Sequence, residues 1–285
     1  MSAGLEPFLI VGAGGMLGRA WCELLRRRRL EFTAFSRTEL DVLDTASMRA
    51  ALTPVTRTVI NCAAFTDVDG AETRETDAHR LNALAVASLA ERCRDASARL
   101  VHYSTDYVFD GETREPYRTD AATSPVNAYG RSKEQGEHLL RRSGSAHLLV
   151  RTSWLYAPWG KNFVRTIAAL ARARARLRVV SDQWGTPTSA EYLARQTLLL
   201  LERGAENTFH VTDGGACSRH DFASAIVRAL QLDCHVEACP TDPVERPARR
   251  PPYAVLDVQA TSALLGPAPG WLFNLGDALS RLEPA

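Results

Sequence analysis

Residues 8–18 read Phe-Leu-Ile-Val-Gly-Ala-Gly-Gly-Met-Leu-Gly, and this stretch decides the fold. Its first four residues are an apolar run typical of a buried strand, and a helical pattern follows at residues 19–29. Between them, Gly12, Gly15 and Gly18 have the spacing G-x-x-G-x-x-G. A strand, a glycine-rich turn and a helix in this order predict a dinucleotide site. The alternative is a glycine-rich turn that holds no ligand.

The three glycines of this turn have different predicted roles. Gly12 permits the tight turn, Gly15 lets a pyrophosphate approach the backbone, and Gly18 allows the helix to pack closely on the strand. The pyrophosphate would then bind the free N–H groups at the helix N-terminus. Met16 and Leu17 complete the predicted cofactor contacts of the turn.

Strand-like and helical patterns alternate through the first half of the chain, which predicts a parallel sheet with helices on both faces. Strands are expected at residues 8–12, 32–36, 58–62, 100–104 and 148–152, and helices at 18–28, 46–52, 80–93 and 125–142. Pro125 suits the first position of the last helix and Gly144 suits its end. We therefore predict a Rossmann-type, doubly wound α/β domain over residues 1–157, with some later segments returning to it.

The pattern changes after Trp154, and residues 158–285 are expected to form a smaller C-terminal α/β lobe that binds substrate. Helices are predicted at residues 162–174 and 190–202, a short strand at 208–212, and a helix capped by Ser218 that runs through Leu230. Residues 240–252 are rich in Pro and Arg. This segment is either a disordered linker or an ordered loop over the substrate.

The composition is that of a soluble enzyme. The chain has 285 residues, 45% of them hydrophobic, and a net charge of +1, which gives no general reason to bind nucleic acid. No apolar stretch approaches the roughly 20 residues of a membrane span, so we expect a cytoplasmic protein. The six cysteines show neither C-x-x-C nor zinc spacing, and reduced thiols are the simplest account.

Lysine is rare, and one lysine is placed where its chemistry matters. Of 34 basic residues only Lys133 and Lys161 are lysine. Lys133 follows Tyr129 by four positions, so the two side chains share one helix face. Arginine cannot replace lysine where a compact ammonium is needed beside a phenol. The alternative is an ordinary exposed pair on a helix.

A hydroxyl pair ends the strand that precedes this helix. Ser104 and Thr105 lie at its C-terminal end, where an open α/β sheet binds its ligand. With Tyr129 and Lys133, one of these hydroxyls suits the reduction of a carbonyl. Tyr129 would donate the proton, and the cation of Lys133 would lower the pKa of that phenol from its usual value of about 10.

With these residues the chain resembles the extended short-chain dehydrogenase/reductase superfamily, and within it the dTDP-4-dehydrorhamnose reductase family. The resemblance covers nearly the whole chain. Its motifs are residues 12–18, 61–72, 104–111, 129–137, 151–156, 162–164 and 182–188. It implies NADPH-dependent reduction of the 4-keto group of dTDP-4-dehydro-L-rhamnose to dTDP-L-rhamnose. A related dTDP-4-keto-6-deoxysugar reductase stays open, and so does a non-enzymatic protein similar to the regulatory subunit of methionine adenosyltransferase.

The resemblance also implies roles for single residues. It favours Thr105 over Ser104 as the catalytic hydroxyl and has Lys133 hold the nicotinamide ribose as well. The remaining implied cofactor contacts are Asp41, Val42, Ala63, Ala64 and Phe65, and the implied substrate contacts are Thr105, Asp106, Trp154 and Asn162.

Arg37 stands at the end of the second predicted strand, where NAD sites tend to have an acid. An arginine there suits a 2′-phosphate, so NADPH is favoured, with NADH as the alternative because Glu39 and Asp41 lie close by.

Two further expectations concern partners. Arg246, Arg249 and Arg250 suit the diphosphate of a dTDP-sugar, although Tyr253 and Ala254 replace the Asn and Ser of the family motif. Some family members form metal-bridged dimers through glutamates. Glu191 matches one such position but Ala20 replaces the other acid, so we assign no metal and leave Mg²⁺ and a homodimer open.

Overall fold

Six parallel strands form the central sheet of the larger lobe in this computed structural model, which describes residues 4–242 and 247–282. In spatial order they are β10 (Asn207–His210), β5 (His147–Thr152), β4 (Arg99–Thr105), β3 (Thr58–Asn61), β1 (Phe8–Val11) and β2 (Phe32–Phe35). The strand order reverses between β1 and β3, and a ligand crevice is expected beyond their carboxyl ends. This sheet confirms the predicted Rossmann-type, doubly wound fold.

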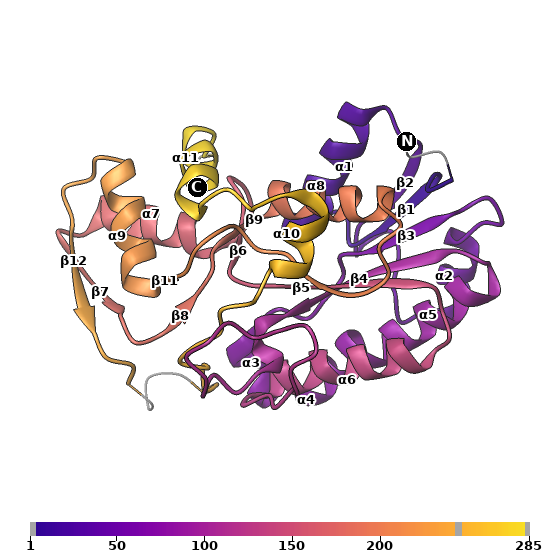
Figure 1. Cartoon of the computed structure of the whole chain (residues 1–285), viewed down its shortest axis with the longest axis horizontal. Helices are drawn as coiled ribbons and strands as arrows, with labels where there is room; N and C mark the ends of the chain where they lie inside the picture. Colours follow the sequence, from indigo (N-terminus) through magenta and orange to yellow (C-terminus); the bar gives the residue numbers. More distant parts are fainter. Residues whose placement is uncertain (1–3, 243–246, 283–285) are drawn as a thin grey trace.

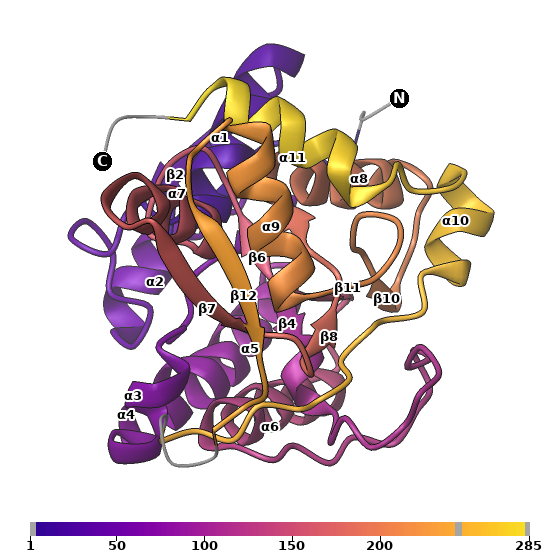
Figure 2. The same cartoon turned by 90° about the vertical axis from the view of Figure 1, so that its left-hand side faces the viewer.

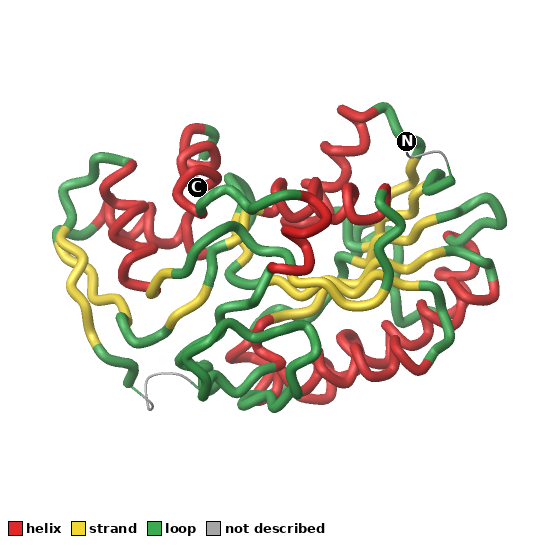
Figure 3. Tube along the Cα trace, viewed as in Figure 1, coloured by secondary structure: helices red, strands yellow, loops and turns green. Residues whose placement is uncertain are grey.

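Helices cover both faces of the sheet because its central strands are apolar on both sides (Figures 1 and 3). On one face α1 (Met16–Arg28) packs against α8 (Ala190–Glu202) and the sheet. On the other face lie α2 (Thr45–Ala51), α5 (Ala85–Asp95) and α6 (Ala128–Arg142). The later segments α8 and β10 thus belong to the larger lobe, beside α10 (Gln259–Leu265).

Short elements after β3 and β4 shape the edge where the site is expected. After β3 come α3 (Val68–Thr73), α4 (Glu75–His79) and a π-helical turn, η1 (Arg80–Leu84), which runs into α5. After β4 comes the 3₁₀ turn η2 (Asp106–Val108).

The smaller lobe, on the left in Figure 1, has its own core around Phe222. Its parallel pair β7 (Arg176–Val180) and β12 (His235–Cys239) faces the viewer in Figure 2, with the helices α7 (Phe163–Ala173), α9 (Arg219–Ala229) and α11 (Trp271–Ser280). Two further short strand pairs are β6 (Leu155–Tyr156) with β9 (Thr188–Ser189), and β8 (Trp184–Gly185) with β11 (Cys217–Ser218).

The structure corrects the predicted start of α6 and confirms its end and the cap of α9. The helix expected from Pro125 begins at Ala128, because Asn127 caps it by accepting a hydrogen bond from the N–H of Gly130 at 2.7 Å. Gly144 follows its end with φ of 71°. Ser218 caps α9 in a capping box with Asp221.

The elements β7, β12, α10 and α11 were not anticipated. In the described part of the chain no helix is long and apolar enough to cross a membrane.

Candidate active site

The glycine turn joins β1, α1 and the end of β3 at van der Waals distance. Gly12 has φ of 81°, and a Cβ there would lie 2.7 Å from the backbone nitrogen of Ala63. A Cβ on Gly18 would lie 2.3 Å from the Gly12 carbonyl oxygen. Gly15 is the N-cap of α1 and offers no side-chain cap, so the first N–H groups of the helix are available to an anion.

Opposite charges meet at the end of β2. Arg37 is exposed there. The Glu39 carboxylate accepts hydrogen bonds from the backbone N–H and the hydroxyl of Ser36, at 2.8 and 2.7 Å, and these bonds lower its pKa. In the loop beyond, Asp41 is exposed and Val42 is half-buried. A 2′-phosphate at this edge would meet the cation of Arg37 and the anion of Glu39.

Asn82 holds the loop that follows β3, a role that sequence reasoning missed. Its Oδ1 accepts from the N–H of Phe65 at 2.8 Å, and its Nδ2 donates to the Phe65 carbonyl at 3.0 Å and to the Ser132 hydroxyl at 2.9 Å. Asn82 is fully buried inside the π-helical turn, a local irregularity that often marks a functional site. It ties Phe65 and the preceding Ala63 and Ala64 to α6.

Thr105 and Asp106 lie at the carboxyl end of β4 and are both buried. The Thr105 hydroxyl donates to Asp106 Oδ1 at 2.9 Å and accepts from the N–H of Tyr107 at 3.1 Å. Burial raises the pKa of Tyr129 and Thr105 opposes this rise, whereas the buried hydroxyl of Ser104 has no hydrogen-bond partner among the described residues. The structure therefore puts Thr105 beside the phenol.

Gly130 lets α6 approach the end of β4. A Cβ at this position would lie 2.2 Å from the carbonyl oxygen of Tyr107. The close approach sets the Tyr129 ring edge-on to Tyr107, with ring centroids 6.0 Å apart. One turn further along α6, Lys133 is buried with 2% of its surface exposed.

We expected the charge of Lys133 to lower the pKa of Tyr129, but Lys133 is not among the groups that shift this pKa. Its Nζ donates to the carbonyl of Tyr103 at 2.6 Å and lies 3.3 Å from Nε2 of His102. The pKa of Tyr129 is raised, not lowered, first by burial and then by the charge of Asp106. The expected fall was wrong, because the phenol is buried while Nζ of Lys133 is directed at the carbonyl of Tyr103.

Arg219 enters the crevice from α9 and was not identified from the sequence. Its Cζ lies 3.5 Å from the ring centroid of Trp154 and 5.2 Å from that of Phe163. Burial raises the pKa of Asp106 to about 7, while the hydrogen bond from Thr105 and the charge of Arg219 oppose the rise. A cation from the smaller lobe thus acts on Asp106 at the carboxyl end of β4 and covers part of the Trp154 ring.

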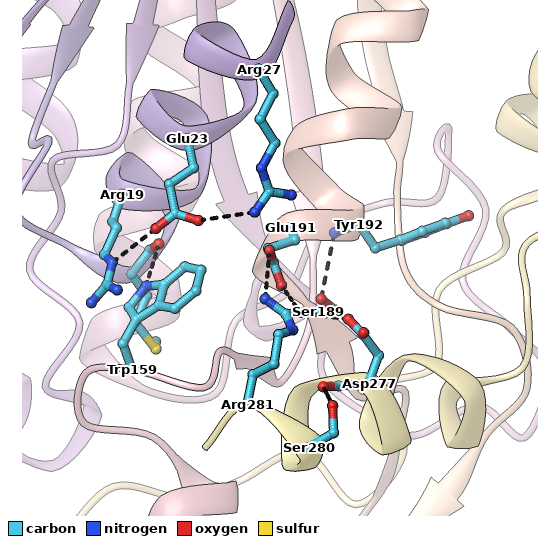
Figure 4. A network of polar contacts seen from close by, with 11 residues as sticks. Arg19, Glu23, Arg27, Trp159, Ser189, Glu191, Tyr192, Asp277, Ser280 and Arg281 are labelled. Atoms are coloured by element: carbon cyan, nitrogen blue, oxygen red, sulfur yellow. Dashed lines mark hydrogen bonds and ion pairs between the residues drawn. The ribbon is translucent and has the colours of Figure 1, made fainter. Parts of the chain in front are cut away.

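The Asn162 side chain has structural partners. Its Oδ1 accepts from the N–H of Arg165 at 3.2 Å to cap α7, and its Nδ2 donates to the carbonyls of Ala157 and Trp159 at 2.9 and 3.0 Å. The Trp159 indole in turn donates to the carbonyl of Met16 at 3.2 Å (Figure 4). These contacts hold the loop before α7 against the glycine turn, and a substrate contact for Asn162 stays a prediction.

Glu191, which matches a metal-bridge position of some family members, is already paired. Glu191 binds the guanidinium of Arg281, at 3.1 Å from its Nη1, and Arg281 also binds Asp277 (Figure 4). Among residues 4–242 and 247–282, no group of three or more His, Cys, Asp and Glu side chains could hold a metal ion. Here a guanidinium neutralises the carboxylate of Glu191.

Arg250, which we expected to suit the diphosphate of a dTDP-sugar, is already paired with a carboxylate. It binds both oxygens of Asp69, at 2.7 and 2.9 Å. The carbonyl of Arg249 accepts a hydrogen bond from Asn127 at 2.8 Å, so residues 249 and 250 are both held against the larger lobe. Arg246 lies outside the described residues.

Comparisons with known proteins find related sequences and structures over nearly the whole chain. A family model described as the RmlD substrate binding domain matches residues 7–283. A dTDP-4-keto-6-deoxy-D-glucose reductase of Streptomyces niveus is 42% identical over 98% of both chains. A dTDP-4-dehydrorhamnose reductase of Mycolicibacterium smegmatis is 37% identical over 98% of this chain and 87% of its own. The structure of a Bacillus anthracis dTDP-4-dehydrorhamnose reductase in complex with NADP superimposes with a TM-score of 0.91, at 32% identity, over 96% of this chain and 98% of that one.

Proposed function

The chain belongs to the RmlD substrate binding domain family, and we propose that it is an NADPH-dependent reductase of dTDP-4-dehydro-L-rhamnose. The observation that carries the proposal is the meeting of three groups at one sheet edge. Thr105 from β4 and Tyr129 and Lys133 from α6 lie at the carboxyl ends of the strands, where an open α/β sheet binds its ligand.

The residues present fit a dinucleotide. Gly12 and Gly18 leave a cradle that a Cβ would fill, and the uncapped N-terminus of α1 suits a pyrophosphate. We assign the adenosine end to the edge beyond β2, where Arg37 would bind a 2′-phosphate, and the ribose next to the nicotinamide to Lys133. When bound, NADPH supplies the hydride that adds to the carbonyl carbon.

Side chains of the protein would protonate the carbonyl oxygen. Negative charge grows on the carbonyl oxygen as hydride adds to the carbon, so a donor must lie within hydrogen-bond reach. Tyr129 would donate its phenolic proton to this oxygen, and Thr105 would orient the same oxygen by a hydrogen bond. Trp154 and Asp106 would contact the sugar, and Arg219 lies over the Trp154 ring while its charge acts on Asp106.

A second substrate is supported by a specific observation. The relative that is 42% identical over 98% of both chains is named a dTDP-4-keto-6-deoxy-D-glucose reductase. That activity is our second candidate, because the same groups would reduce a 4-keto carbon in either sugar. A purely non-enzymatic role is disfavoured because Thr105, Tyr129 and Lys133 are all present.

The test uses both substrates with the purified protein. NADPH oxidation should depend on the 4-keto nucleotide-sugar, and NMR of the product should show the rhamno configuration. Another 4-epimer or 6-deoxysugar would favour the second candidate. No turnover by folded, NADPH-bound protein with either sugar would refute both, and stoichiometric recovery of a methionine adenosyltransferase would then support the binding role.

A further inference from the structure

His102 is fully buried on β4, three residues before Thr105. Its Nε2 lies 3.3 Å from Nζ of Lys133, and its Nδ1 lies 3.1 Å from Nδ2 of Asn61 at the end of β3. Neither His102 nor Asn61 has a part in the chemistry proposed above. Their side chains nevertheless connect Lys133 to the loop that follows β3.

Ala63, Asn61, His102 and Lys133 form a chain of contacts, and the N–H of Ala63 determines which atom donates in each one. The backbone N–H of Ala63 can only donate, and Oδ1 of Asn61 accepts from it at 3.1 Å. Asn61 therefore directs its Nδ2, which is a donor, toward His102. Nδ1 of His102 must accept, so the hydrogen of the neutral ring is on Nε2 and points at Lys133.

An imidazole N–H suits the lone pair of an uncharged amine and opposes an ammonium, which has only donors. Lys133 keeps one hydrogen bond to the carbonyl of Tyr103 at 2.6 Å in either form. We propose that His102 is a positioning residue for Lys133 that favours its uncharged amine over its ammonium in the free protein. The proposal rests on the role given to Lys133 in the proposed function, but it concerns an equilibrium that exists without substrate.

The charges around Lys133 leave this preference in place. Glu137, one turn further along α6, favours the ammonium. Both of its oxygens are already bound by Arg151 of β5, at 2.9 and 2.7 Å. His147, at the start of β5, disfavours a positive charge on His102.

Burial governs the pKa values of Lys133, His102 and the nearby thiol of Cys93. Burial raises the pKa of Cys93, which α5 packs on the same face of the sheet, to about 12. Burial also lowers the pKa of Lys133 to about 8, with Glu137 opposing. Burial and then the charge of Lys133 lower the pKa of His102 well below its usual value. These directions agree with a neutral imidazole beside a weakly basic lysine.

The preference has a consequence for the reductase. Lys133 is an ammonium below its midpoint and an amine above it, and only the ammonium can favour the phenolate of Tyr129. Activity should therefore fall as the pH rises through the Lys133 midpoint. His102 would set the upper pH limit of the enzyme without touching substrate.

The two lysines of the chain allow a direct measurement. Protein labelled with ¹³C at lysine Cε shows one signal for Lys133 and one for the exposed Lys161, which Lys133→Met assigns. In the free wild-type protein we expect Lys133 to titrate near pH 8. In His102→Gln, whose amide can turn its oxygen toward Lys133, the midpoint should rise by about one pH unit, a tenfold change in the ammonium-to-amine ratio.

The matched control is His210→Gln, which removes another buried histidine, one that contacts Arg151 and the carbonyl of Asp257. It should leave the Lys133 midpoint in place. Equal midpoints in wild type and His102→Gln would overturn the proposal. If His102→Gln does not fold, ¹⁵N spectra of the wild-type imidazole decide, because a hydrogen on Nδ1 of His102 overturns it and a hydrogen on Nε2 supports it. Neither measurement uses a sugar, so missing reductase activity would refute only the proposed function.

Discussion

Replacing Gly130 by alanine tests whether the close approach of α6 to β4 assembles the site. The new Cβ would lie 2.2 Å from the carbonyl oxygen of Tyr107 and 2.9 Å from Cβ of Pro125. Ordinary contact begins at 3.4 Å, so α6 and η2 must separate by about 1.2 Å, the difference between 3.4 and 2.2 Å. The clash is with the backbone carbonyl of Tyr107, so a change of side-chain rotamer cannot relieve it.

Two effects of different size should follow. Overpacking of this kind costs about 1–3 kcal/mol of unfolding free energy, partly offset by about 1 kcal/mol because alanine favours the helix over glycine. The catalytic effect should be larger. Tyr129 moves with α6 while Thr105 stays on β4, and a misplacement of about 1 Å can reduce the rate about 10²-fold.

The assay is kcat/KM for the 4-keto nucleotide-sugar, with thermal unfolding of the same samples. Gly276→Ala is the control, because it also replaces a helical glycine and its Cβ would have nothing within 4 Å. We expect Gly276→Ala to keep its activity and Gly130→Ala to lose about two orders of magnitude in kcat/KM. If Gly130→Ala matches Gly276→Ala in both measurements, the contact with Tyr107 does not position Tyr129.

Three further predictions use single substitutions. Tyr129→Phe should keep folding and NADPH binding but lose about 10²–10⁴ in kcat, and near wild-type turnover would mean that another acid protonates the substrate. Arg37→Asp should weaken NADPH and spare NADH in binding titrations, since a charge-assisted contact is worth about 1.5–3 kcal/mol; equal loss for both would make Arg37 structural. Asp106 binds a proton more tightly when folded, with a pKa raised to about 7 by burial, so its contribution to stability falls as the pH rises from about 4 to 7. Unfolding curves of Asp106→Asn and wild type should converge at low pH and separate toward pH 7 in favour of the variant, and a constant difference would contradict the assignment.

Local regularities in the sequence were enough to predict the fold class, and they supplied the candidates for the reacting groups. Gly12, Gly15 and Gly18 between a strand and a helix indicated the doubly wound sheet, because the turn needs a backbone without Cβ at the positions that the structure crowds. The four-residue spacing of Tyr129 and Lys133 put both on one helix face, since helical periodicity is a property of the chain alone. Element boundaries were less secure: α6 was predicted to begin at Pro125, but Asn127 caps it and it begins at Ala128.

The partners of those groups were decided only by the tertiary structure. Arg219 reaches Trp154 from a helix more than sixty residues away in sequence, and Asn82 holds Phe65 from inside a π-helical turn that no local pattern indicated. Lys133 binds the Tyr103 carbonyl and faces His102. Burial and then the charge of Asp106 raise the pKa of Tyr129, where the charge of Lys133 alone predicted a fall. The physical reason is that spacing along a helix or strand assigns a side chain to a face, whereas burial, hydrogen-bond direction and neighbouring charge depend on which other elements pack against that face.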